Sequence, residues 1–146
     1  MSKLINVYAS SGAQPVCIVD VSPTRGNDLA SVRQAIEIDA DFFCVGYNPS
    51  KSVRVDSSVM AYIIKRETGK KVIFSLASRD MNKLALESHL LGAQLLDLHN
   101  VVILRGDDFT EIERTTVKSV NDFTPTGLIE AIRKLNHGED YRGLQL

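Results

Sequence analysis

Charged side chains that could take part in chemistry stand at the ends of apolar runs in this 146-residue sequence. The clearest case is the aliphatic run Val101 to Leu104, which breaks abruptly into Arg105-Gly-Asp-Asp108. A second case is Asp20, which lies in the run that starts at Pro15. An aliphatic run bounded by polar residues predicts a strand buried on both faces. Because α/β folds keep their sites at the carboxyl ends of such strands, both positions are candidates for a site.

Taken alone, these residues allow a second interpretation. The string Arg105 to Asp107 can close a strand with a tight turn and a surface ion pair, because three residues make a weak motif. Asp20 is as readily a cap for the following turn as a catalyst. Arg79 and Asp80, which follow another apolar run, are expected to pair with each other or to cap the next helix.

Other reactive residue types give weaker signals. The three histidines include no pair with metal-ligand spacing, so no metal site is predicted. Cys17 and Cys44 both fall in apolar runs, which predicts small buried side chains in a reducing compartment. The segment Asn48 to Ser52 lacks the glycines of a phosphate-binding loop and is expected to be a solvated loop.

Composition favours one soluble globular domain over residues 1–146. Hydrophobic residues make up 44% and charged residues 24% of the chain, and the net charge is −1. This balance argues against non-specific binding to nucleic acid or to anionic membranes. The first residues lack the apolar core of a signal peptide, and no apolar run is long enough to span a membrane. We therefore expect a cytoplasmic protein.

Apolar spacing predicts four strand–helix units. Residues 1–14 are expected to be irregular, and Gly92 is expected to pack closely against a neighbouring element. Strands are predicted at 15–22, 41–47, 71–77 and 100–104, and helix starts at Asp28, at Asp56 or Ser57, at Asn82 and at Thr124. Alternating strands and helices imply a parallel sheet, which is either half of a (β/α)8 barrel or a small open α/β sheet.

Three strings in the second half of the chain resemble the methylenetetrahydrofolate reductases. They are Ser78-Arg-Asp-Met-Asn82, Leu86-Glu-Ser-His-Leu-Leu-Gly-Ala93 and Asn100-Val-Val-Ile-Leu-Arg-Gly-Asp107. The segment Leu135 to Gly143 is similar to one found in the short bacterial forms. The resemblance implies a (β/α)8 barrel that binds flavin at the carboxyl ends of its strands. It also implies reduction of methylenetetrahydrofolate to the methyl form, with electrons from NAD(P)H or a redox partner.

The resemblance also assigns roles to individual residues. It implies that Arg105, Gly106 and Asp107 line the flavin (FAD), with Asp107 on the pyrimidine side of the ring. Asp20 falls where the family has its catalytic glutamate, a general acid that helps to open a ring of the folate. A glycine lets the backbone approach the flavin closely, and a carboxylate near the ring tunes its redox potential.

The sequence departs from the family pattern at several of these positions. Asp20 is one methylene shorter than glutamate, which limits its reach as a proton donor. Gly46 stands where many members have threonine, and Ser75 stands where they have histidine or glutamine. Pro23 is the one proline left of a family pair.

The four units correspond to the N-terminal half of the family's barrel. Half a barrel has open edge strands and one uncovered sheet face. We therefore expect a fragment of a longer product, two halves that pair as a homo-oligomer or with a partner subunit, or a flattened open sheet. The chain alone is expected to hold FAD weakly or not at all. The alternative function is a non-catalytic half-barrel that serves as a subunit or interaction module.

Overall fold

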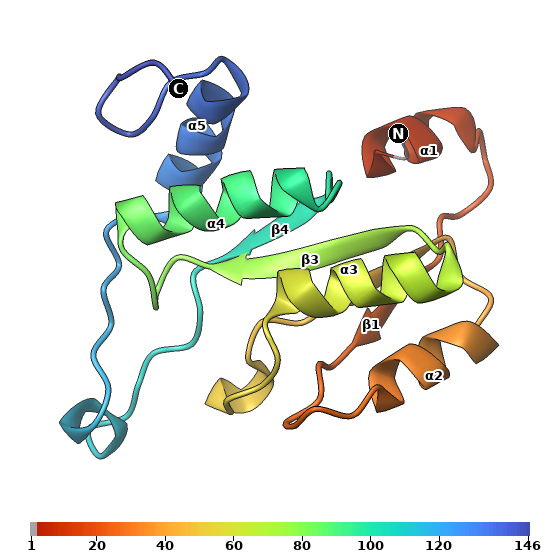
Figure 1. Cartoon of the computed structure of the whole chain (residues 1–146), viewed down its shortest axis with the longest axis horizontal. Helices are drawn as coiled ribbons and strands as arrows, with labels where there is room; N and C mark the ends of the chain where they lie inside the picture. Colours follow the sequence, from red (N-terminus) through yellow and green to blue (C-terminus); the bar gives the residue numbers. More distant parts are fainter. Residues whose placement is uncertain (1–2) are drawn as a thin grey trace. The chain divides into compact units, whose positions relative to one another are not determined.

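The computed structural model describes residues 3–146, and strands and helices alternate along most of them (Figure 1). The elements are α1 (Leu4–Ser10), β1 (Ile18–Val21), α2 (Ala30–Glu37), β2 (Phe42–Val45), α3 (Ser57–Thr68), β3 (Val72–Ala77), α4 (Lys83–Leu95), β4 (Val101–Leu104) and α5 (Pro125–Asn136). Two short 3-10 turns lie at Pro49–Lys51 and Glu113–Thr115.

The four strands form one open parallel sheet in the order β1-β2-β3-β4. The register pairs Ile18 with Phe42 and Phe43 with Val72, and the Phe74 amide donates to the carbonyl of Asn100 at 3.1 Å. Sequence order and spatial order coincide, which is the arrangement of consecutive strands in a (β/α)8 barrel. The predicted fold class is therefore confirmed as α/β, with four parallel strands that match part of such a barrel.

The contacts divide the chain into two compact units, and β3, β4 and α4 contribute residues to both. The first unit consists of Met1–Ser75 and Ala93–Val102, and the second consists of Leu76–Gly92 and Ile103–Leu146. All four strands have residues in the first unit. The carboxyl ends of β3 and β4, with the loops that follow them, belong to the second unit.

In the first unit the two faces of β2 have different covers. Phe42 and Cys44 cluster with Ile73 on one face, where Leu4 and Val7 of α1 pack against them. Because side chains alternate along a strand, the other residues of β2 face the opposite side. Helix α3 contacts β2 and α2. On the first face, the short helix α1 therefore packs against the buried cluster.

Helix starts agree well with the sequence. The Asp56 carboxylate caps α3 by accepting from the amides of Ser58 and Val59, and Gly69 ends that helix with φ +69°. In the second unit, Asn82 Oδ1 accepts from the Ala85 amide at 2.9 Å, and Thr124 Oγ1 accepts from the Gly127 amide at 3.0 Å. The polar residues predicted to begin these helices do cap them.

Several expectations were wrong. Residues 4–10 form helix α1 rather than irregular chain, and β1 begins at Ile18 rather than at Pro15. Cys17, which was expected to be buried, is exposed. A Cβ at Gly92 would meet no atom within 4 Å, so this helical glycine makes no close contact.

In the second unit a buried carboxylate fixes the last residues of the structure. Glu87 of α4 is 4% exposed, and its Oε2 accepts from the Tyr141 amide at 2.9 Å. The Asp140 carboxylate accepts from the Arg142 and Leu144 amides and from the Arg142 guanidinium.

Within residues 3–146, no helix has the length and apolar character that crossing a bilayer requires.

Candidate functional site

Asp20 lies at the carboxyl end of β1, on the edge of the sheet in the first unit. It is exposed, and the register places it opposite Cys44 of β2. The thiol of Cys44 lies 3.8 Å from the hydroxyl of Ser75 on β3. Because paired residues of a parallel ladder point to the same face, these three polar side chains share one face of the sheet. An exposed carboxylate, a thiol and a hydroxyl therefore form a row across three strand ends.

The electrostatics of this row keep the thiol protonated. Burial raises the pKa of the Cys44 thiol, and the nearby charge of Asp20 and its hydrogen bond to the thiol raise it further. The hydrogen bond with Ser75 acts in the opposite direction and offsets only part of the rise. Cys44 is therefore suited to donate a hydrogen bond to Asp20 and is a poor nucleophile.

The loop after β2 explains why glycine stands at position 46. A Cβ at Gly46 would lie 3.0 Å from Pro49 Cγ, so a larger residue there would displace the proline. The same loop is tied to the end of β1, because Arg54 Nη1 donates to the Pro23 carbonyl at 2.8 Å. Glycine at position 46, where many family members have threonine, therefore fits the close packing of Pro49 against this backbone.

In the second unit, Arg79 joins the ends of β3 and β4. It is 5% exposed, and its Nε and Nη2 form a two-pronged ion pair with Asp80 at 2.5 and 2.7 Å. Its Nη1 donates to the Asp107 carbonyl at 2.6 Å, and its guanidinium lies 4.1 Å from the ring centre of Phe109. The predicted pairing of Arg79 with Asp80 is confirmed. The bond to the Asp107 carbonyl was missed, because a backbone partner 28 residues away leaves no signal in the sequence.

Gly106 has a structural reason to be glycine. Its φ is +89°, and a Cβ there would lie 3.1 Å from the Cβ of Arg79 and 3.5 Å from that of Ala77. The space that a side chain would need is therefore filled by protein. The backbone conformation at this position also requires glycine.

The charged neighbours of Gly106 face the solvent. The side chains of Arg105 and Asp108 are 65% and 64% exposed and form an ion pair at 3.0 Å. Asp107 is exposed as well. The surface ion pair that the sequence allowed is present, and the turn also presents a carboxylate and a guanidinium that a ligand can reach.

The residues proposed from sequence fall into two groups. In the first unit Asp20 is grouped with Cys44 and Ser75, and in the second unit Arg105 to Asp107 are grouped with Arg79. The first group lies in the carboxyl-terminal halves of β1, β2 and β3, and the second group follows the carboxyl ends of β3 and β4.

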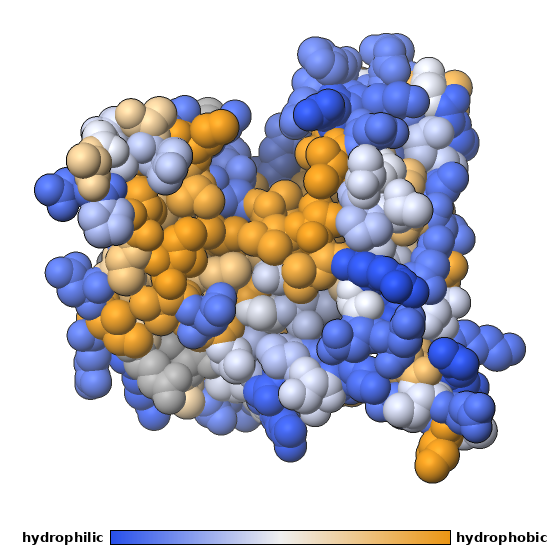
Figure 2. Space-filling model, turned by 180° about the vertical axis from the view of Figure 1, so that it is seen from behind, coloured by the Kyte–Doolittle hydropathy of each residue, from blue (hydrophilic) through white to orange (hydrophobic). Residues whose placement is uncertain are grey.

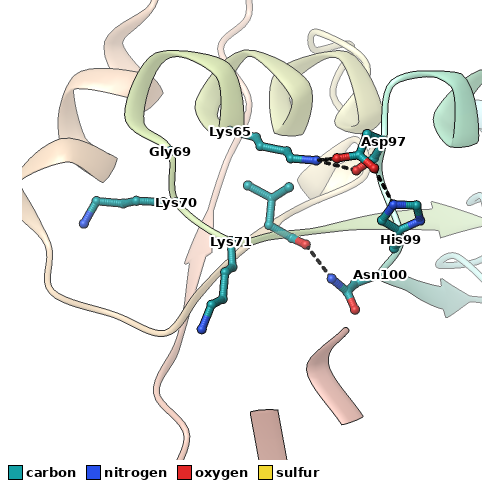
Figure 3. A pocket seen from close by; sticks show the side chains of 8 residues that line it. Lys65, Gly69, Lys70, Lys71, Asp97, His99 and Asn100 are labelled. Carbon is teal, nitrogen blue, oxygen red and sulfur yellow. Dashed lines mark hydrogen bonds and ion pairs between the residues drawn. The ribbon is translucent and has the colours of Figure 1, made fainter. Parts of the chain in front are cut away.

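A separate cavity of about 270 Å³ lies at the amino ends of β3 and β4 in the first unit (Figure 3). Lys65 pairs with Asp97, whose other carboxylate oxygen lies 2.5 Å from His99 Nε2. Figure 3 shows the side chains of Lys70 and Lys71 pointing away from this pair. The polar groups thus bind one another instead of converging on a ligand, and conserved ligand sites of α/β sheets lie at the opposite strand ends.

Within residues 3–146, no three histidine, cysteine or acidic residues are arranged to hold a metal ion. The strand ends carry carboxylates, a thiol, a hydroxyl and guanidinium groups.

An open parallel sheet with polar residues at its strand ends defines an α/β protein of the kind that binds ligands at those ends. The family described as methylenetetrahydrofolate reductase matches residues 24–143, and the chain belongs to that family. The match includes Arg105, Gly106 and Asp107, whereas Asp20 lies four residues before its start. No curated protein matches the chain.

Proposed function

We propose that this chain supplies the flavin-binding part of a reductase that converts 5,10-methylenetetrahydrofolate to 5-methyltetrahydrofolate. The observation that carries the proposal is the family match over residues 24–143, which includes the turn from Arg105 to Asp107. NAD(P)H or a protein redox partner would supply the electrons. Such a reaction belongs to one-carbon metabolism and methionine biosynthesis in the cytoplasm.

The exposed groups of the second unit suit the polar edge of FAD. A carboxylate such as that of Asp107 accepts hydrogen bonds from ring N–H groups, and a guanidinium such as that of Arg105 donates to carbonyl oxygens. Flavin, when bound, supplies the hydride that reduces the methylene group. Asp107 would orient the ring and, through its charge, tune the potential at which that hydride is given up.

Asp20 is the proposed proton donor for opening the folate ring. Its exposed position at the end of β1 leaves it open to a substrate. A general acid must come within about 3 Å of the atom it protonates. The short aspartate side chain therefore demands a close approach of the folate to β1.

Product formation tests this proposal directly. The protein is incubated with FAD, a chemical reductant and methylenetetrahydrofolate, and 5-methyltetrahydrofolate is measured by chromatography. We expect turnover that depends on protein and FAD, and we expect Asp20→Asn to reduce it by about 100-fold or more. Product formation that is equal with and without the protein would contradict the proposal.

A second candidate function is a half-barrel module that pairs with another chain. The observation that favours it is the poorly covered sheet face of the first unit. Hydrophobic side chains gather on the side of the molecule drawn in Figure 2. In the first unit, a groove of about 430 Å³ is lined by Leu4, Ile5, Tyr8, Val16 and Ile18.

The two edge strands of the sheet offer a place where a second chain can pair. β1 and β4 are the edge strands, and Ile18 and Val102 on them are 45% and 37% exposed. Open strands with exposed apolar side chains pair readily with other strands. We propose a second copy of this chain as the occupant, because β4 of one copy can extend the parallel sheet at β1 of the other.

A further inference from the structure

The buried arginine of the second unit has no role in the family assignment. Arg79 is 5% exposed, yet it carries a full charge. Burying a charge costs free energy unless the charge is paired and hydrogen-bonded. Asp80 supplies the paired charge through two bonds of 2.5 and 2.7 Å, and Phe109 supplies an aromatic face at 4.1 Å.

One nitrogen of this guanidinium is hydrogen-bonded to the turn that carries the proposed flavin contacts. Arg79 Nη1 donates to the Asp107 carbonyl at 2.6 Å. The Cβ and Cδ of Arg79 also pack where a Cβ of Gly106 would lie, at 3.1 and 3.5 Å. Arg79 therefore holds the turn in two ways, by a hydrogen bond to the Asp107 carbonyl and by packing against Gly106.

The main chain of Arg79 holds a third segment. Its carbonyl accepts from the Val120 amide at 2.7 Å and from the Asn121 amide at 3.3 Å. Residue 79 thus connects the end of β3, the turn after β4 and the segment that leads to α5. A turn with φ of +89° at Gly106 needs such support, because it does not gain the regular hydrogen bonds of a helix or strand.

We infer that Arg79 is a positioning residue for flavin binding. It contacts no ligand itself. It holds the peptide that links Asp107 to Asp108 so that the Asp107 carboxylate is presented to the flavin, and it leaves Arg105 exposed to bind as well. This inference rests on the proposed function, since it assigns to Arg79 the orientation of a proposed flavin contact.

A double-mutant cycle separates positioning from general stabilisation. FAD affinity is measured by fluorescence quenching for the wild type, Arg79→Lys, Asp107→Asn and the double variant. Lysine keeps the charge opposite Asp80 but loses the planar fork that reaches Asp80 and the Asp107 carbonyl together. We expect each single variant to bind FAD about tenfold more weakly, as for the loss of a charge-assisted hydrogen bond. In the Arg79→Lys background, Asp107→Asn should cost less than twofold.

The controls make each outcome decisive. Arg133→Lys changes an exposed arginine of the same unit on α5 and should leave FAD affinity unchanged. If Arg79→Lys does not fold, Asp80→Asn serves as the first partner of the cycle, because it removes the charge that pairs with the guanidinium and holds it in place. If the effects of the two substitutions are additive, the positioning role of Arg79 is overturned and the proposed function is unaffected. A wild type that does not quench FAD fluorescence would overturn the proposed function, and the positioning role with it.

Discussion

Asp20 and Cys44 influence each other across the first two strands. The charge of Asp20 adds to the effect of burial in raising the pKa of the Cys44 thiol. Asp20→Asn removes that charge, so we expect the thiol pKa to fall and the thiolate fraction at pH 8 to rise. The rate of labelling by a disulfide reagent measures this, in a Cys17→Ser background because Cys17 is exposed. An unchanged or slower rate would show that the carboxylate does not act on the thiol.

The glycines provide a second test at the level of single residues. Gly106→Ala forces a side chain into a φ of +89° and against Arg79, and we expect a loss of about 1–3 kcal/mol in the free energy of unfolding. Gly92→Ala is the matched control in α4 of the same unit. No atom lies within 4 Å of the added methyl, and the helix gains up to about 1 kcal/mol from alanine. Urea unfolding compares the two, and equal effects would contradict the structure of the turn.

At the scale of elements, most helices and strands could be predicted, because apolar runs and capping residues carry local signals. Asp56, Asn82 and Thr124 were placed correctly, since each satisfies amides in its own first turn. Helix α1 was missed because it is only seven residues long and has no capping side chain, and Leu4 and Val7 pack against the distant sheet.

The candidate site was harder to predict than the elements. The strand-end positions of Asp20 and of Arg105 to Asp107 followed from the chain pattern. The contact of Arg79 with the Asp107 carbonyl did not, because it depends on how two loops meet rather than on residue type. Two of the family-like strings thus meet through this bond, and two others meet through Glu87 and Tyr141. Part of the family resemblance therefore reflects packing rather than catalysis.

The segment around Asp140 predicts a response to acid. Hydrogen bonds from Leu144 and Arg142 lower the pKa of the Asp140 carboxyl below its ordinary value. A lowered pKa in the folded state adds stability that is present above about pH 4 and is lost as the pH falls through the folded-state pKa. We expect Asp140→Asn to lower Tm at pH 7 and to flatten the fall of Tm below pH 4. Asp39→Asn, an exposed control, should change neither, and parallel acid curves for Asp140→Asn and the wild type would contradict the assignment.

At the scale of the whole molecule, the open sheet face predicts self-association. Light scattering should report a dimer at micromolar concentration, because pairing would cover exposed apolar residues such as Ile18 and Val102. We expect Val102→Glu to shift the protein to monomer. Val53→Glu is the matched control, since Val53 is 88% exposed and lies on a loop outside the sheet. A monomeric wild type, or equal effects of the two substitutions, would contradict pairing through this face.

Pairing also bears on the activity. Barrel enzymes bring catalytic residues from the ends of several strands together. A paired sheet would enclose flavin better than an open one. Dimer formation and flavin binding are therefore expected to strengthen each other, because each favours the same arrangement of strands.

The most direct test of the central claim is a titration of FAD with the purified chain, followed by the quenching of flavin fluorescence. We expect saturable binding that Asp107→Asn weakens by about tenfold, as for the loss of a charge-assisted hydrogen bond, and that Asp39→Asn leaves unchanged. The absence of quenching at all protein concentrations, monomeric and dimeric alike, would show that this member of the methylenetetrahydrofolate reductase family does not bind flavin through the turn after β4.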